Sequence, residues 1–234
     1  MRVFVTGASG HIGSAVVPEL LEAGHQVVGL ARSDASAEAL AAAGAEVRRG
    51  DLDDLGGLGE AAAAADGVIH LAFKHDLMGA GDFPAAVAAD FAAIKALAAA
   101  LEGTGKPLVT TSGTLMLAFA GITGRPGTEA DFAAGGRADT ENFVIGLAER
   151  GVRSSAVRLP PIVHSSLDHH GFAHILIRIA RQAGVSAYVA DGTNRWPSVH
   201  PRRVERVHRR PPVGPVPHVR RHADLPGAAD QDVR

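Results

Sequence analysis

The feature that most constrains the fold is a glycine turn near the amino terminus, set between a strand-like and a helix-like segment. Residues 2–6 form a β-branched and aromatic run that predicts a buried strand, and the turn from Gly7 to Gly13 follows it directly. Apolar residues then recur with a helical period from Ile12 onward. Such a junction predicts an anion site, because free N–H groups and the positive end of the helix dipole point at whatever lies above the turn. A glycine turn without a ligand is the alternative, but the place of this turn favours a bound dinucleotide.

Short apolar runs and helical patterns alternate through the first 160 residues. This alternation predicts right-handed βαβ units and an α/β fold with a doubly wound parallel sheet. The expected strand order is 3-2-1-4-5-6, with the ligand at the carboxyl ends of the strands. Later strands are expected at residues 26–30, 46–48, 68–71, 108–111 and 154–158. Helices are expected at residues 12–23, 35–43, 84–101 and 137–150, and the segment Asp51-Leu-Asp-Asp opens a further Gly/Ala-rich helix.

Composition narrows the class of protein. A chain of 234 residues with 46% hydrophobic residues suits one α/β domain with a packed core. The net charge of −2 carries no nucleic-acid signature, and the absence of cysteine excludes disulfides and thiolate metal sites. Met1 leads straight into the first strand, which leaves no room for a leader, and no apolar run reaches membrane-spanning length. We therefore expect a soluble cytoplasmic protein with a small-molecule substrate and without nucleic-acid or membrane partners; a homodimer stays open.

Two segments follow the predicted core of residues 1–160. Residues 161–200 carry a Pro/His-rich loop, a helix expected at 172–183 and a short strand expected at 187–189, which together suggest a small and incomplete substrate-side region. Residues 201–234 hold six of the 13 prolines and eight arginines without an apolar period, so we expect an irregular tail, disordered or loosely attached. Its Arg/Pro/Gly/Ala-rich composition is what a GC-rich gene yields when read out of frame. A basic arm for nucleic acid is the less favoured alternative.

The spacing of the glycine turn resembles that of a known family. Thr6 opens the motif Thr-Gly-x-x-Gly-x-x-Gly, in which Gly7 takes the tight turn, Gly10 lets backbone approach a pyrophosphate, and Gly13 lets the helix pack close to the strand. In this motif the chain resembles the short-chain dehydrogenase/reductase superfamily, in its extended and atypical branches of NAD-dependent epimerase/dehydratase-like proteins. The resemblance extends to about His200 and implies a Rossmann fold with an NAD(P) cofactor.

The resemblance also implies which groups surround that cofactor. Asp51, followed by Leu52, matches the position whose carboxylate accepts a hydrogen bond from the adenine amino group, although a helix cap would account for it equally. The segment Leu71-Ala72-Phe73 matches the loop that runs beneath the cofactor. The implied set also holds the turn residues Ser9, His11 and Ile12, together with Arg137 and Pro160.

The end of the second strand bears on the choice between NAD and NADP. An NAD enzyme places Asp or Glu there to accept from the ribose 2′-OH, but this chain has Ala31, followed by Arg32 and Ser33. A guanidinium can clamp a 2′-phosphate, with the serine hydroxyl as an added donor. The sequence therefore predicts NADP, with NAD less favoured; an arginine in a solvated loop is the alternative.

The catalytic residues that the resemblance implies are present only in part. Family members carry a Ser/Thr after the fifth strand, which Ser112 matches and Thr114 could replace, although such hydroxyls also satisfy backbone groups at strand ends. The usual Tyr-x-x-x-Lys on the next helix is absent. Taking Glu141 as the acidic residue that follows this motif places Arg137 at the Lys position and Ala133 at the Tyr position. An arginine can bind a ribose or phosphate but cannot exchange protons near neutral pH.

Histidines are the best replacement proton donors. His164 follows the sixth strand, and its neighbours His169, His170 and His174 cluster with Asp168. Any of these histidines could transfer a proton near neutral pH. The alternative is that they are solvated loop residues without a chemical role. His170 and His174, four residues apart on one predicted helix, could also bind a metal ion. This is disfavoured because no third ligand stands at a recognised spacing.

Two functions therefore follow from the sequence. The favoured one is an oxidoreductase of the epimerase/dehydratase type, with NADP-dependent hydride transfer on a small carbonyl or alcohol and with Ser112, Thr114, Arg137 and His164 as the candidate catalytic residues. The alternative is an NADP-binding redox sensor or inactive paralogue, because the acid/base dyad is absent.

Overall fold

The structure is a computed structural model that describes residues 1–168, 171–201 and 204. The irregular tail expected after residue 200 therefore lies almost entirely outside the described residues, and so do His169 and His170.

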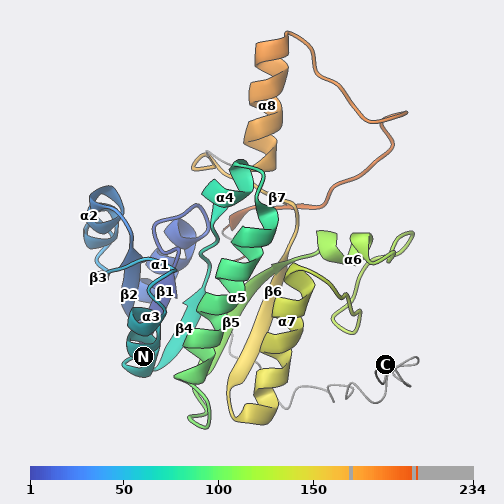
Figure 1. Ribbon diagram of the computed structural model, residues 1–234. Helices are drawn as coiled ribbons and strands as arrows, with labels where there is room; N and C mark the ends of the chain where they lie inside the picture. Colours follow the sequence, from blue (N-terminus) through green and yellow to red (C-terminus); the bar gives the residue numbers. More distant parts are fainter. Residues whose placement is uncertain (169–170, 202–203, 205–234) are drawn as a thin grey trace, which may run out of the picture.

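A six-stranded sheet forms the centre of the molecule (Figure 1), with all its paired strands parallel and in the order β3-β2-β1-β4-β5-β6. This confirms the predicted doubly wound topology. The order reverses between β1 and β4, so a crevice for a ligand is expected at the carboxyl ends of these two strands. The strands are β1 Arg2–Thr6, β2 Gln26–Ala31, β3 Glu46–Arg49, β4 Gly67–His70, β5 Pro107–Gly113 and β6 Arg153–Leu159.

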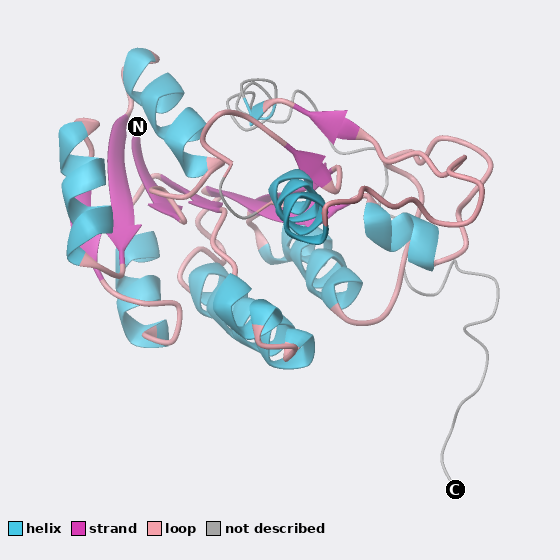
Figure 2. Cartoon of the chain, turned by 90° about the horizontal axis from the view of Figure 1, so that it is seen from above, coloured by secondary structure: helices cyan, strands magenta, loops and turns pink. Residues whose placement is uncertain are grey.

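Helices cover both faces of the sheet (Figure 2). On one face, Val5 and Ile69 of the sheet pack in a core cluster with Val16 of α1 and Leu40 of α2. On the other face, α3 and α5 supply most of the helical side chains of the second core cluster, and α7 contacts α5 and β6. These helices are α1 Gly13–Glu22, α2 Asp34–Ala42, α3 Leu55–Ala63, α5 Phe83–Ala99 and α7 Arg137–Gly146, which a 3₁₀ turn over Leu147–Arg150 extends.

The starts of three helices follow from their capping residues. The Ser33 side chain accepts a hydrogen bond from the Ser36 amide at the start of α2, and the Asp82 side chain accepts one from the Ala85 amide at the start of α5. Asp54 accepts from the Gly57 amide to begin α3, so the helix starts from the last residue of the segment 51–54 that was predicted to open it. The sequence alone does not show which of the neighbouring aspartates 51, 53 and 54 caps the helix, because helix ends are set only to within one or two residues.

The segment beyond β6 differs most from expectation. Helix α8, Phe172–Ala183, has the predicted bounds, but none of its described residues is buried, and Figure 1 shows it standing away from the sheet. The predicted strand at 187–189 is wrong: Tyr188 and Val189 are 74% and 76% exposed, and no described strand pairs with them. A separate two-stranded ladder joins β7, Ile162–Val163, to β8, Ser198–Val199. Two short helices, α4 His75–Gly79 and α6 Leu115–Phe119, follow strands at the ligand edge.

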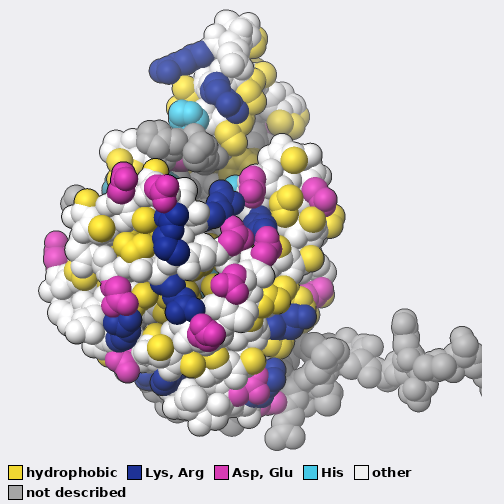
Figure 3. Space-filling model, turned by 60° about the vertical axis from the view of Figure 1, so that its left-hand side comes forward, with side chains coloured by type: hydrophobic (Ala, Val, Ile, Leu, Met, Phe, Trp, Pro, Cys, Tyr) yellow, Lys and Arg dark blue, Asp and Glu magenta, His cyan; other side chains and the backbone are white. Residues whose placement is uncertain are grey.

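The surface carries charges of both signs. Figure 3 shows acidic and basic side chains side by side across one face. Ion pairs such as Arg48–Glu60 and Arg49–Asp34 also join opposite charges at the surface of the protein. In the part of the chain that the structure describes, no helix is long and apolar enough to cross a membrane.

Candidate functional site

The glycine turn between β1 and α1 is shaped by contacts that exclude side chains. Gly7 has a φ of +65°, and a Cβ atom there would lie 2.7 Å from the backbone nitrogen of Ala72 at the end of β4. A Cβ atom at Gly13 would lie 2.3 Å from the Gly7 carbonyl oxygen and 2.4 Å from that of Ala8. Both positions therefore require glycine, one for its conformation and its contact with β4, the other for the close approach of α1.

The amino end of α1 stays open to a ligand. Gly10 is exposed, and a Cβ atom there would meet only the Gly7 carbonyl oxygen within 4 Å, at 3.1 Å. Among the described residues no side chain caps α1 at its N-cap Ile12, whereas side chains cap α2, α3 and α5. Ser9 is exposed as well, and His11 Nε2 lies 2.8 Å from Ser165 Oγ, which links the turn to the segment after β7. The turn thus fits the diphosphate of a dinucleotide, because open backbone amides and the helix dipole both favour an anion.

Charged side chains meet beyond the ends of β2, β3 and β4. Arg32 Nη1 lies 3.2 Å from Asp76, and Arg32 Nε lies 4.0 Å from Asp51. The Lys74 ammonium lies 3.7 Å from the same Asp51 carboxylate and pairs with Asp53. These contacts raise the pKa of Lys74, mainly through its hydrogen bond to Asp53, so the ammonium stays charged.

This cluster contains Arg32, and Ser33 follows it; these are the two residues that the sequence predicts to bind the 2′-phosphate of NADP. Arg32 is 65% exposed yet held by carboxylates, so the solvated-loop alternative describes only part of its surroundings. Ser33 caps α2, which engages its hydroxyl, and Leu52, next to Asp51, is buried. Lys74 and Asp76 were not predicted, since only their position directly after β4 could have indicated them.

The loop after β4 is tied to the glycine turn. The Leu71 amide donates to the Thr6 carbonyl oxygen at 3.2 Å, and the Ala72 amide donates to Thr6 Oγ1 at 3.3 Å. Phe73 lies beneath the Arg137 guanidinium, whose central carbon is 4.4 Å from the ring centroid. The predicted segment 71–73 therefore lies at the point where the strand order reverses, against the residue at the start of α7.

Ser112 is 5% exposed and faces α7. Its hydroxyl donates to Glu141, whose other carboxylate oxygen accepts from Arg158 Nε at 2.8 Å. The Thr114 amide and hydroxyl both point to the Leu159 carbonyl oxygen, at 2.9 and 3.4 Å. Both hydroxyls thus have protein partners, in keeping with the alternative that they satisfy strand-end groups.

Arg137 begins α7 and reaches the carboxyl ends of β4 and β5. Its Nη2 donates to the Thr111 carbonyl oxygen at 3.0 Å, and its Nε lies 3.7 Å from Asp90 on α5. Burial lowers the pKa of Arg137, while the negative charge of Asp90 opposes that shift. Ala133, at the position expected for the tyrosine, is buried and offers no proton. Asp90 and its neighbour His70 are buried polar residues that the sequence interpretation missed; a carboxylate within an alanine-rich helix was the available signal.

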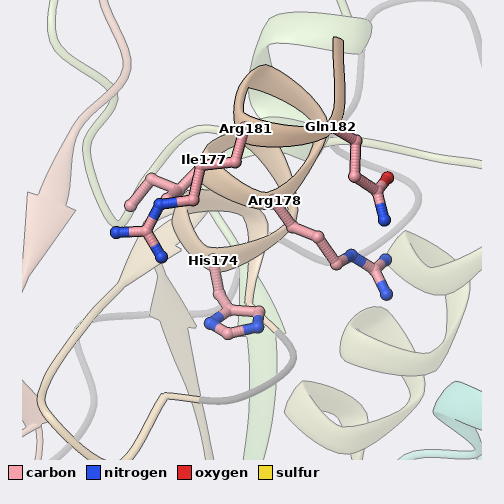
Figure 4. A pocket seen from close by; sticks show the side chains of 5 residues that line it. All are labelled: His174, Ile177, Arg178, Arg181 and Gln182. Atoms are coloured by element: carbon pink, nitrogen blue, oxygen red, sulfur yellow. The ribbon is translucent and has the colours of Figure 1, made fainter. Parts of the chain in front are cut away.

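The histidines do not gather into one described group. His164 is exposed, its amide donates to the Val199 carbonyl oxygen, and its ring stands edge-on to His200 at 6.3 Å. His174 lies instead on α8, where it lines an open pocket of about 280 Å³ with Ile177, Arg178, Arg181 and Gln182 (Figure 4). The described residues contain no group of three His, Asp or Glu side chains that could hold a metal ion. Pro160 follows β6 directly at the same edge of the sheet as the glycine turn.

Comparisons with known proteins agree with this geometry. The family model for the NAD dependent epimerase/dehydratase family matches residues 3–130. Uncharacterized proteins of Schizosaccharomyces pombe and Saccharomyces cerevisiae are 46% and 43% identical to the chain over 200 and 209 residues, each match covering 86% of this chain and 66% of the relative. The chain thus spans just under two thirds of the length of these relatives.

Solved structures show the same fold at low identity. UDP-glucose 4-epimerase of Thermotoga maritima, solved with UDP-glucose, is 20% identical with a TM-score of 0.72, covering 88% of this chain and 71% of that one. UDP-glucuronic acid 4-epimerase of Bacillus cereus, solved with UDP-glucuronic acid and NAD, is 18% identical with a TM-score of 0.68 over 88% and 71% of the two chains. The family match spans the glycine turn, the loop after β4 and Ser112, and on this ground the chain belongs to the NAD dependent epimerase/dehydratase family.

Proposed function

We propose that this chain binds NADP across the carboxyl ends of β1 and β4, and that the protein uses it to reduce a small carbonyl or oxidise a small alcohol. The observation that carries the proposal is the glycine turn: no side chain fits at Gly7 in the turn or at Gly13, the first residue of a helix whose described amino end lacks a side-chain cap. When bound, the nicotinamide would supply or accept the hydride. Membership of the family supports an NAD(P)-binding, oxidoreductase-like function.

The preference for NADP rests on the end of β2. Ala31 is 1% exposed and offers no carboxylate to a ribose 2′-OH, whereas Arg32 next to it is largely exposed. A 2′-phosphate would bind Arg32 by replacing its exposed contacts with Asp76 and Asp51, which are weak in solvent. Asp51 lies beside Arg32 and is the group we assign to the adenine amino group.

The chemical step is the less supported half of the proposal. Ser112 could orient a substrate oxygen only by exchanging its bond to Glu141 for one to the substrate. Arg137 holds a positive charge in place but cannot exchange a proton, so the proton would come from an exposed group such as His164. The commitment of both hydroxyls, at Ser112 and Thr114, is the observation that favours the second candidate, NADP binding without turnover by a redox sensor.

A binding and turnover experiment on the full chain separates these candidates. NADPH and NADH are titrated by cofactor fluorescence, and NADPH oxidation is then followed with a panel of small aldehydes and ketones. UDP-glucose, with which a solved neighbour was determined, carries hydroxyls and no aldehyde or ketone group, so it is tested in the other direction, by following the reduction of NADP⁺. Binding with steady oxidation supports the oxidoreductase, and binding without consumption supports the sensor. Absence of binding by both cofactors refutes the proposal. A cytoplasmic location and a homodimer are part of the same proposal and call for localisation and sedimentation measurements.

A further inference from the structure

A chain of buried polar groups runs from the glycine turn to the start of α7. Thr6 Oγ1 lies 2.8 Å from His70 Nδ1, and His70 Nε2 lies 3.1 Å from Asp90 Oδ1. Asp90 Oδ2 faces Arg137 Nε at 3.7 Å. Thr6, His70 and Asp90 are each at most 1% exposed, so these contacts form away from solvent.

His70 links the two ends of this chain through its two ring nitrogens. Thr6 Oγ1 accepts from the Ala72 amide and lies against His70 Nδ1, while His70 Nε2 faces Asp90 Oδ1. Asp90 therefore presents one carboxylate oxygen to His70 and the other to Arg137.

Asp90 Oδ2 and Arg137 Nε are both buried, and neither has a hydrogen-bond partner among the described residues. Their separation of 3.7 Å is too long for a hydrogen bond but close enough for strong attraction at a buried site. Burying an ionised carboxylate is costly unless an opposite charge compensates it. Arg137 is thus the group that compensates the burial of the Asp90 carboxylate.

The Asp90–Arg137 pair lies near the point where the strand order of the sheet reverses. In a doubly wound sheet the two halves of a dinucleotide lie on opposite sides of the point where the strand order reverses. The glycine turn and Arg32 belong to the side of β1, β2 and β3, whereas Phe73, Thr111 and Arg137 belong to the side of β4 and β5. Arg137 therefore stands where the second nucleotide half, with its nicotinamide, would lie.

We propose that Asp90 is a positioning residue, which holds the Arg137 guanidinium over Phe73 so that this cation contacts the nicotinamide nucleotide. This inference rests on the dinucleotide binding proposed above. Three contacts fix the guanidinium from three elements: Asp90 of α5, the Thr111 carbonyl of β5 and the Phe73 ring after β4. A lysine there could not make them together, because its single ammonium lacks the planar fork of donors.

A purely structural ion pair between α5 and α7 is the competing explanation, and two ligands distinguish it. NADPH occupies both halves of the crevice, whereas 2′,5′-ADP occupies only the half beside β1 and β2. The full chain and its Asp90→Asn variant are titrated with both ligands by calorimetry. Asn keeps the shape and the bond to His70 but removes the charge that faces Arg137. We expect NADPH to bind roughly tenfold more weakly to the variant, because the guanidinium loses one of its three contacts, with the affinity for 2′,5′-ADP unchanged.

Two further variants keep the test decisive. Arg137→Lys, which retains the charge at a partly exposed position, is expected to show the same selective loss for NADPH. Asp82→Asn changes a carboxylate at the exposed cap of the same helix α5 and is expected to change neither affinity. Equal losses for both ligands, or no loss for either in Asp90→Asn and Arg137→Lys, would overturn the positioning role while leaving the proposed function intact. An unmodified chain that binds neither ligand would overturn both.

Discussion

Arg32 lies between two carboxylates from different segments, and a bound 2′-phosphate must compete with both. Exposed ion pairs contribute only about 0.2–1 kcal/mol, so a dianionic phosphate that accepts two hydrogen bonds from the guanidinium has the advantage. The pKa of Asp76 is lowered, mostly by a backbone hydrogen bond and also by Arg32, so this carboxylate stays charged at neutral pH. Its charge would weaken, without abolishing, the preference for NADP that we propose.

Replacing Arg32 tests that preference. Arg32→Ala is expected to weaken NADPH binding by about tenfold and to leave NADH binding unchanged, because only NADPH carries the 2′-phosphate. Fluorescence titration measures both affinities. Arg49→Ala, which removes an arginine paired with Asp34 nearby, is the matched control and should change neither. Equal affinities of the unmodified chain for the two cofactors would contradict the assignment of Arg32.

Ser112 and Tyr188 give opposite expectations for turnover. If the chain turns over substrate, Ser112→Ala should lower kcat at least tenfold, since a positioned group of this kind contributes about that much or more. Tyr188→Phe should leave kcat nearly unchanged, because Tyr188 is 74% exposed and lies beyond α8, far along the chain from the α7 helix. Steady-state kinetics on both variants, with unfolding midpoints as a check on the fold, measure this. An inactive but folded Tyr188→Phe would show that α7 is not the catalytic helix.

Among the elements, those defined by local signals could be predicted and those defined by distant contacts could not. The strands and the glycine turn follow from apolar runs and short spacings, and α8 was predicted to the residue. The partners of Arg32 and Ser112 lie 44 and 29 residues away in sequence, so no local pattern indicates them. The Asp90–Arg137 pair likewise depends on the packing of α5 against α7. The predicted strand at 187–189 is wrong because an apolar run needs a neighbouring strand to pair with.

Gly13 tests the junction of β1 and α1. Gly13→Ala is expected to destabilise the protein by about 1–3 kcal/mol, because its Cβ atom would meet two backbone oxygens that cannot both move away. Gly59→Ala on α3 is the matched control: the nearest atom to its Cβ is 3.8 Å away, so the change should stabilise the helix by roughly 0.4–1 kcal/mol. Urea unfolding of the two variants measures both effects. Equal midpoints would contradict the close approach of α1.

At the scale of the whole molecule, the chain divides into a packed sheet and an outlying segment. The matched part of the chain, 86% of its length, covers only 66% of the curated relatives. Within the described residues, the crevice at β1 and β4 has core packing on both faces of the sheet, whereas α8 has none. The cofactor site that we propose thus lies on the packed sheet, whereas the segment after β6, where the substrate side was expected, has little packing of its own.

The exposure of α8 has a consequence for local opening of the chain. Its apolar side chains Leu176, Ile177 and Ile179 are each more than half exposed, so burial adds little to the stability of this helix. A helix of 12 residues is marginal in water by itself. We therefore expect backbone amides of α8 to exchange with deuterium within seconds, while those of α5, whose inner face is buried, exchange only on opening of the whole domain. Mass-spectrometric exchange compares the two helices in one sample, and equal protection would mean that α8 draws stability from a partner.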